Sequence, residues 1–401
     1  MLDPDDEVAR WAASGAMYLT GRRAGPPLPA PDGLVSRARW LEAILARWLP
    51  APVDVLALLG ERAAIADLSR NGTISCGGSA RLLRAADGWV AVSLARPDDL
   101  AAVPALLETD VTSDVWSTVA DAVGQRRSVE LVERATLLGV PMSIAGEVHA
   151  DEALVVTVYG SAAPLESLRG RTIVDLSSLW AGPLCGHLLG LGGARVVKVE
   201  STERPDGARH GPAAFFDLLH SGHECVSVDL TTPGGVDRLT QLLQQADVVI
   251  EASRPRALAQ HGIVAERFFE AGRLRAWVSI TGYGRTGPAA MRVAFGDDAA
   301  VAGGLVAWEA GWPRFCADAV ADPLTGVVTA CAVIGALAKG RRVLIDAAMS
   351  RVSAVMGGTR SAGARWAGSL APPRARLPRA RPPRSRAAPI GTNNGNGPEL
   401  G

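Results

Sequence analysis

The chain has 401 residues, a length that predicts two or three domains, because single hydrophobic cores rarely grow beyond about 250–300 residues. Hydrophobic residues make up 48% and charged residues 20% of the sequence, which excludes a mainly disordered chain. Lys plus Arg and Asp plus Glu each number 41, so the formal net charge is zero. That balance argues against a nucleic-acid-binding protein.

Cysteine and histidine spacing indicates neither a disulfide framework nor a zinc site. The five cysteines lie far apart without a CxxC pair, and the six histidines form no HxxxH pair. We therefore expect a reduced, cytoplasmic protein without a metal. The acidic N-terminus lacks the apolar core of a signal peptide, and the longest apolar stretch, residues 324–338, is too short to span a bilayer. No membrane association is expected.

Residues 1–165 alternate helical patterns with one clear strand. The strand is expected over residues 89–94, directly after the Asp87–Gly88 turn. Helices are expected over residues 8–19, 34–48, 113–123 and 128–138.

Residues 166–356 follow a different rhythm, in which strands alternate with helices. Strands are expected over residues 172–176, 195–200, 225–229, 247–251, 276–280 and 342–345, and helices over 182–191, 232–245 and 324–338. This alternation predicts an α/β fold with a doubly wound, mostly parallel, Rossmann-like sheet and helices on both faces. Residues 357–401 are rich in Arg and Pro and are expected to form a solvated or loosely packed tail.

The segment Gly282-Tyr-Gly-Arg-Thr-Gly287 matches the GxGxxG pattern of dinucleotide-binding proteins. Here Pro288 follows at once, and no βαβ unit surrounds the motif as a nicotinamide or flavin site requires. The glycines are more consistent with a tight turn or with close approach of the backbone to a ligand.

Asp322 opens the apolar helix and has two interpretations. Because Pro323 follows it at the expected first helical position, Asp322 is predicted to be the N-cap, which is a purely structural role. The same position at the positive end of the helix dipole is expected to keep the carboxylate ionised. An ionised, oriented carboxylate beside an acyl group can act as a nucleophile.

Eight segments follow one another in an order typical of a known family. They are residues 170–183, 191–200, 227–235, 246–251, 254–255, 279–288, 321–322 and 343–348. This set, over about residues 168–350, resembles the family III CoA-transferases, the group of carnitine-CoA and formyl-CoA transferases. The resemblance implies a CoA-binding domain over residues 166–356, acyl-CoA and carboxylic acid substrates, and Asp322 as nucleophile.

The resemblance also implies which residues contact coenzyme A. They are Leu179, Trp180, Ala181, Val228, Asp229, Leu230, Thr231, Ala252, Ser253, Arg254, Thr281, Gly282, Tyr283 and Gly284. The adenine-diphosphate end is expected near Arg254 and the Gly282–Gly284 loop, because an Arg without another role suits phosphate.

The region before residue 166 is similar to family material that normally comes later in the chain. Residues 76–92 resemble the small domain's glycine loop and first strand, and residues 138–141 resemble its end. Residues 1–165 are therefore expected to form a small α+β domain placed before the CoA-binding domain. The backbone amides of Gly77 and Gly78 are candidates for stabilising an oxyanion. Family members form interlocked dimers, so we expect a homodimer in which a second chain supplies this loop.

The expected function is transfer of CoA from an acyl-CoA to a carboxylic acid through an aspartyl-CoA thioester. An acyl-CoA racemase or isomerase of the same fold is one alternative, although Gly296-Asp297-Asp298 lacks the His that related racemases carry. A non-catalytic CoA-binding subunit is the other. It is motivated by the altered domain order and by unusual residues at contact positions, among them Trp180, Gln260 and His261.

Overall fold

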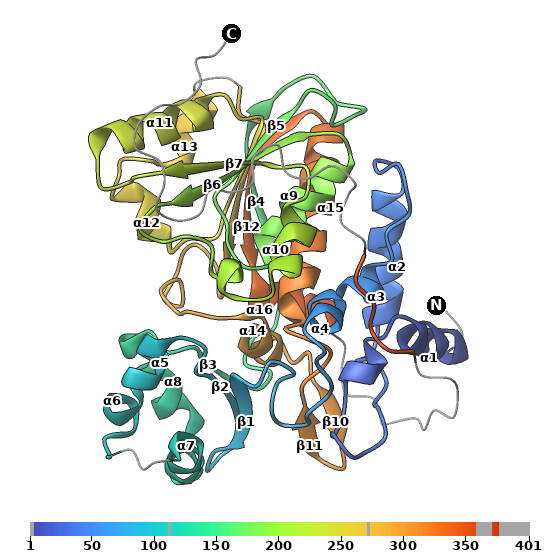
Figure 1. Ribbon diagram of the computed structural model, residues 1–401, viewed down its shortest axis with the longest axis vertical. Helices are drawn as coiled ribbons and strands as arrows, with labels where there is room; N and C mark the ends of the chain where they lie inside the picture. Colours follow the sequence, from blue (N-terminus) through green and yellow to red (C-terminus); the bar gives the residue numbers. More distant parts are fainter. Residues whose placement is uncertain (1–3, 111–113, 271–272, 358–370, 377–401) are drawn as a thin grey trace.

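A seven-stranded sheet forms the centre of the protein in the computed structural model, which describes residues 4–110, 114–270, 273–357 and 371–376 (Figure 1). Its strand order is β4-β12-β9-β8-β5-β6-β7. The edge strand β4 pairs antiparallel with β12, and all other neighbours are parallel. The strands are β4 (Val155–Ser161), β5 (Thr172–Asp175), β6 (Arg195–Ser201), β7 (Glu224–Val228), β8 (Val248–Glu251), β9 (Ala276–Thr281) and β12 (Arg341–Ala348). The predicted α/β fold with a mostly parallel sheet is confirmed.

Helices cover both faces of this sheet (Figure 1). One face carries α11 (Pro233–Gln244), α12 (Pro255–Ala259) and α13 (Ala265–Glu270), and the other α9 (Ala181–Leu191), α10 (Ala213–His220), α15 (Ala321–Ala338) and α16 (Met349–Met356). The middle strand β8 is buried at all its positions. Runs of Val and Ile suit such strands, because neither face of the sheet meets water.

The order of the strands changes direction between β5 and β8, and this predicts a binding crevice at the carboxyl edge of the sheet. The chain builds β5, β6 and β7 toward one edge and then returns to β8, which lies on the other side of β5. Loops after β5 and β8 therefore leave the sheet in opposite directions at its carboxyl edge. Ligands of doubly wound folds bind at such a switch point.

A second unit contains the antiparallel strands β1 (Ala80–Arg84), β2 (Trp89–Ser93) and β3 (Met142–Ile144), with helices α5 (Pro97–Ala101), α6 (Val103–Leu107), α7 (Val115–Gly124) and α8 (Ser128–Leu138). It has its own hydrophobic core, which includes Val90, Leu106 and Leu131. The helix α14 (Gly296–Ala302) lies between this unit and the large sheet, and the hairpin of β10 (Ala307–Glu309) and β11 (Trp312–Arg314) lies beside β1 (Figure 1).

The first helices of the chain pack against α15, one of the helices that cover the large sheet. They are α1 (Pro4–Ala13), the 3₁₀ turn η1 (Met17–Leu19), α2 (Leu34–Leu45), α3 (Val55–Leu58) and α4 (Glu61–Ile65). Trp11 and Leu34 share one core with Leu324 and Val327 of α15. The division of the chain at residues 165 and 356 stays a prediction, and residues before 165 contribute to both cores.

Two sequence expectations differ from the structure. The helix expected over residues 8–19 ends at Ala13, because Gly15 adopts a left-handed φ of +85° and breaks it. The tail expected to be loosely packed contains a docked segment, residues 371–376, whose Arg376 pairs with the buried Glu61. The rest of the tail beyond Gly357 lies outside the described residues.

Within the described residues, α15 is the one helix long and apolar enough to cross a membrane by length and composition. Of its 18 residues, 78% are buried inside the protein. Core helices of the same length and composition share this property.

Candidate active site

Asp322 lies in the first turn of α15, and the prediction that it is the N-cap is wrong. The helix begins at Ala321 with Val320 as N-cap, because the chain bends into the helix earlier, through left-handed residues at Ala317 and Ala319. The backbone amide of Asp322 already donates to the Ala319 carbonyl at 2.9 Å. Its side chain is thereby free of a capping role and lines a pocket.

The ionisation of Asp322 also differs from the expectation. The pKa of its carboxyl is raised to about 7, first by burial and then by the negative charges of Asp297 and Asp318, against the lowering by Arg62 and by a hydrogen bond from the Gly296 amide. The helix terminus therefore does not keep the group fully ionised. A carboxyl with this pKa is shared between acid and base forms near neutral pH.

Gly296, at the start of α14, is a glycine for a steric reason. A Cβ atom at this position would lie 2.4 Å from Asp322 Oδ2 and 2.4 Å from the Ala319 carbonyl oxygen. Both distances are far inside van der Waals contact. The absence of a side chain allows the Gly296 amide to approach the carboxylate.

Arg62 of α4 supplies the positive charge nearest to this group of acids. Its guanidinium forms two hydrogen bonds with the fully buried Asp318, one of them 2.9 Å long from Nε to Oδ2. Burial lowers the pKa of Arg62, but Asp318 outweighs this and keeps it above its usual value. The same guanidinium lies 5.7 Å from the centre of the Trp180 ring. Trp180 is thus buried behind the pocket, and its predicted contact with CoA stays a prediction.

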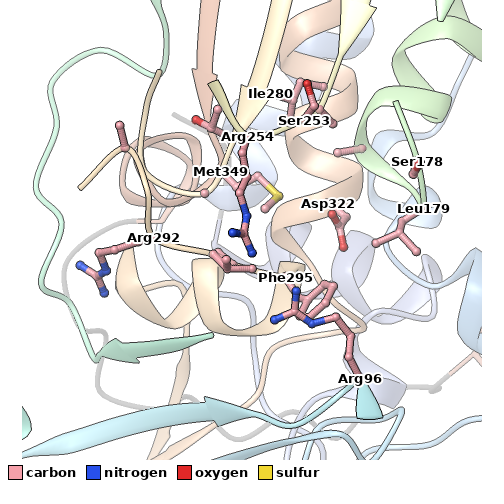
Figure 2. Close-up of a pocket in the computed structure, with 17 residues that line it drawn as sticks. Arg96, Ser178, Leu179, Ser253, Arg254, Ile280, Arg292, Phe295, Asp322 and Met349 are labelled. Atoms are coloured by element: carbon pink, nitrogen blue, oxygen red, sulfur yellow. The ribbon is translucent and has the colours of Figure 1, made fainter. Parts of the chain in front are cut away.

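The structure brings eight of the predicted site residues together in one pocket of about 280 Å³ (Figure 2). It lies at the carboxyl edge of β5, β8 and β9, beside the start of α15. The eight are Leu179, Ala181, Ala252, Ser253, Arg254, Thr281, Gly282 and Asp322.

Three arginines line this pocket, and two have carboxylate partners. Arg96 forms a bidentate pair with Asp99, and Arg292 pairs with Glu147 at 2.6 Å. The guanidinium of Arg254 forms no hydrogen bond or ion pair within the part of the chain that the structure describes. In Figure 2 its guanidinium extends toward the pocket's interior, whereas Arg292 points away from Asp322. Arg254 is therefore the cation available to a ligand.

A second pocket, of about 450 Å³, lies at the carboxyl ends of β6 and β7. Four predicted CoA contacts, Val228, Leu230, Thr231 and Ser253, line it, together with Gln260 and His261. Ser178 and Ser253 line both pockets, so the two pockets adjoin each other at the switch point.

The remaining predicted contacts line neither pocket. Asp229 accepts hydrogen bonds from Thr231, and the buried Tyr283 contacts Arg292. Gly284 donates to the Thr281 hydroxyl at 2.8 Å and adopts a φ of +108°, which supports the predicted tight turn. Their contact with CoA stays a prediction.

The glycine loop lies near Asp318 within the same chain. Cys76 Sγ is 3.3 Å from the Ala317 carbonyl oxygen, and a Cβ at Gly77 would lie 3.5 Å from Arg62 Nη2. Gly78 adopts a φ of +82°. No second chain is needed to bring this loop to the acids, although its role as an oxyanion site and the homodimer stay predictions.

Sequence reasoning missed Arg62, Arg96, Arg292 and the acids Asp297 and Asp318. None belongs to a local motif, and their meeting depends on tertiary packing. One feature of the sequence could have drawn attention to Asp297. It is the acidic residue that stands where related racemases have His, directly before Asp298.

Several known proteins are similar to part of this chain. The chain is 33% identical over 193 residues to the succinate–glutarate CoA-transferase of Agrobacterium fabrum, covering 44% of this chain and 48% of that protein. It is 27% identical over 195 residues to the formyl-CoA:oxalate CoA-transferase of Escherichia coli, covering 45% and 47%. A CAIB/BAIF family protein from Brucella suis, a solved structure, is 30% identical over 49% of this chain and 55% of that one, with a TM-score of 0.44.

The chain thus spans about half the length of the relatives that it matches. The profile of CoA-transferase family III matches residues 168–385, which is more than half of the sequence. The match includes six of the seven strands of the large sheet, most residues of both pockets, and Asp322. The chain belongs to CoA-transferase family III.

Proposed function

We propose that this protein moves CoA from an acyl-CoA to a carboxylic acid through an aspartyl-CoA thioester on Asp322. The observation that carries the proposal is the position of this carboxyl. It opens onto a pocket built from the loops predicted to hold CoA, and its pKa is about 7. A nucleophile that is ionised in part at neutral pH, and that no cation holds in a direct pair among the described residues, suits covalent catalysis.

The two adjoining pockets suit the two ends of CoA. Its sulfur and its diphosphate are separated by the whole pantetheine arm, so they cannot occupy one small cavity. We place the sulfur in the pocket with Asp322 and the nucleotide end in the pocket with Val228 and His261, with the arm passing Ser178 and Ser253. This revises the expected location of the diphosphate near Arg254, which lines the nucleophile's pocket.

The proposed chemistry begins when the ionised Asp322 carboxylate attacks the thioester carbonyl carbon. The C–S bond breaks, CoA leaves as thiolate, and an aspartyl-acyl anhydride remains. The thiolate then attacks the Asp322 carbonyl carbon and releases the donor as a carboxylate, leaving aspartyl-CoA. The acceptor carboxylate attacks this thioester and forms a second anhydride. The released thiolate then takes the acceptor acyl group and restores Asp322.

Each attack creates a tetrahedral oxyanion, which needs hydrogen-bond donors aimed at it. The amides of Gly77, Gly78 and Gly296 are candidates, since Gly77 lies beside Arg62, Gly78 follows it in the same loop, and Gly296 faces Asp322. Water must be kept away, because anhydrides hydrolyse readily. Phe295 and Met349 contribute apolar surface to the pocket.

We further propose that the acyl group or the acceptor carries a second carboxylate. The relatives are named for succinate, glutarate and oxalate, all dicarboxylates. Arg254, without a partner among the described residues, offers a planar pair of donors to such a group. Its place in the pocket with Asp322 allows one ligand to meet both side chains.

Mass spectrometry of the intact protein with a panel of acyl-CoAs tests this function. Each effective donor should leave an adduct of one CoA, less one water, on the wild-type chain. The variant Asp322→Asn should form none. Adding a dicarboxylic acid should then remove the adduct and produce a new acyl-CoA.

The same incubations separate the two alternatives. Exchange of the substrate's α-proton with deuterated solvent, without any adduct, would identify a racemase or isomerase. Binding of CoA with neither adduct nor exchange would identify a non-catalytic subunit. Either result would overturn the proposed transfer.

A further inference from the structure

A short piece of the C-terminal region lies in a groove made by two glycines. Pro373 fills it. A Cβ at Gly15 would lie 2.4 Å from Pro373 Cα, and one at Gly60 would lie 2.8 Å from Pro373 Cβ. Ala371 adds a backbone hydrogen bond to Ala12 at 3.4 Å. We call residues 371–376 the strap.

The strap ends on a buried ion pair. Arg376 forms two side-chain hydrogen bonds with Glu61, and its backbone amide donates to Glu61 Oε1 at 3.2 Å. Glu61 is 1% exposed. A buried carboxylate with three donors from one residue marks a specific docking site, because its charge would be costly without them.

Glu61 and Arg62 are neighbours in the first turn of α4, and they face different partners. Glu61 holds the strap. Arg62 holds Asp318 and is the cation that lowers the pKa of Asp322. Gly60, which the strap contacts through Pro373, immediately precedes both and is the N-cap of α4. Three consecutive residues thus link the strap to the proposed nucleophile.

We propose that the strap is a positioning element, which docks through Pro373 and Arg376 and fixes Arg62 beside the acids around Asp322. Arg376 is accordingly a positioning residue and touches no substrate. The proposal rests on the proposed function for its meaning, but it makes a statement about ionisation that can be measured without any substrate.

The groups that face Asp322 define the expected direction. Arg62 comes from α4, Asp297 from α14 and Asp318 from the loop before α15, while Arg96, Arg254 and Arg292 line the pocket. If the strap is released, the start of α4 loses its contacts with Pro373 and Arg376, and Arg62 can shift relative to Asp322 although it still pairs with Asp318. The lowering of the Asp322 pKa by Arg62 then weakens. The pKa of Asp322 should then rise.

The experiment follows Asp322 directly by carbon NMR in the full chain, with aspartate labelled at the side-chain carboxyl and the signal assigned through Asp322→Asn. Arg376→Gln should raise the titration midpoint by at least about half a pH unit. The matched control is Arg374→Gln, which changes an exposed arginine of the same segment. It should leave the midpoint unchanged.

A double variant distinguishes two causes of a raised midpoint, which are the loss of strap docking and the loss of the distant positive charge of Arg376. Glu61→Gln with Arg376→Gln removes both charges of the pair, so the field at Asp322 changes little, but the docking contact is lost. The midpoint should still rise. A wild-type midpoint in the double variant, or in Arg376→Gln alone, would overturn the proposal. If Arg376→Gln does not fold, Glu61→Gln alone gives the same decision.

Activity then distinguishes failure of the strap from failure of the function. If CoA transfer exists, Arg376→Gln should shift the acid limb of its pH profile upward and recover most activity at high pH. If the NMR midpoint rises in Arg376→Gln but the wild-type protein shows no transfer activity, the positioning role of the strap is supported and the proposed CoA transfer is rejected.

Discussion

Two buried clusters in this protein each combine one cation with several aspartates, but their aspartates have different roles. The lysine cluster consists of Asp175, Lys198 and Asp206, each 0% exposed, and the lysine Nζ lies 2.9 Å from Asp206 Oδ2. The arginine cluster consists of Arg62, Asp297, Asp318 and Asp322. There the single cation pairs directly with Asp318, and Asp322 borders a pocket.

The lysine cluster supports a turn. Asp206 accepts the backbone amide of Leu179 at 2.8 Å, and Leu179 has a left-handed φ of +70° in the loop after β5. Lys198 also donates to the Ser177 carbonyl. These contacts hold the pocket's loop in a conformation that a non-glycine residue rarely adopts. Closed to solvent, the cluster has a structural role.

The arginine cluster has more acids than it can pair. Burial, together with repulsion among the acids, raises the pKa of Asp297 to about 6 and that of Asp322 to about 7. The comparison teaches that burial alone does not identify a reactive acid. The acid without a direct ion pair that also opens to a pocket is the candidate, and within the described part of this cluster that acid is Asp322.

The largest expected effect comes from removing that acid. Asp322→Asn should lower CoA transfer by roughly 10⁴-fold or more, because the covalent route is lost. The melting temperature should not fall, which a thermal scan checks. The matched control Asp217→Asn changes an exposed aspartate of α10 and should retain full transfer. Transfer by Asp322→Asn at the wild-type rate would reject the nucleophile.

Breaking the lysine cluster should instead damage the fold. Lys198→Met leaves the two buried carboxylates without their cation, which should cost about 3–5 kcal/mol of unfolding free energy. Urea denaturation measures the loss. The chain's other lysine, Lys339, is exposed at the end of α15, so Lys339→Met should change stability by less than about 0.5 kcal/mol. Equal stability of the two variants would contradict the structural role of the lysine cluster.

Gly296→Ala tests the close approach to Asp322. Its methyl group must push against Asp322 Oδ2 or the Ala319 carbonyl, so we expect transfer to fall by about 10²-fold and stability by about 1–3 kcal/mol. Gly335 of α15 is the control, since a Cβ there meets no atom within 4 Å. Gly335→Ala should be neutral or stabilising by up to about 1 kcal/mol. Similar losses in both variants would show that the contact is not specific.

The fold and the pocket could be predicted in large part from the sequence. Strands and helices alternate in local patterns, and the family motifs mark Asp322 and the loops after β5, β8 and β9. These features are local in the chain. The left-handed conformation of Leu179 was not predictable, since it depends on Asp206 from a later segment.

The properties of the proposed nucleophile could not be predicted, because they arise from segments far apart. Arg62 and Asp318 are separated by 256 positions, and no motif relates them. The raised pKa of Asp322 depends on burial, which only the packed structure shows. The strap was missed for the same reason: Arg376 has meaning only beside the buried Glu61.

The pH dependence of stability provides a finer test of the arginine cluster. The folded-state pKa of Asp322, about 7, is above the usual value of an unfolded aspartate, about 3.9. Between these values the folded state holds a proton that the unfolded state has lost, so wild-type stability falls as pH rises from about 4 to about 7. The Asp322→Asn variant has no carboxyl group at this position, so this fall in stability with rising pH is absent from it. Its stability relative to wild type should increase over that range, by on the order of 4 kcal/mol, and then stay level. A difference independent of pH would indicate an ordinary pKa.

The smallest expected effect concerns the pocket's available arginine. If Arg254 holds the second carboxylate of a substrate, Arg254→Ala should raise the KM for dicarboxylic acids by about tenfold and leave CoA affinity nearly unchanged. Arg256→Ala, two positions later and also exposed, is the control and should change neither. Weaker CoA binding with a smaller salt dependence would instead assign Arg254 to a phosphate. The lysine cluster would then support a nucleotide site beside the nucleophile, and the placement of CoA along the two pockets would have to be reversed.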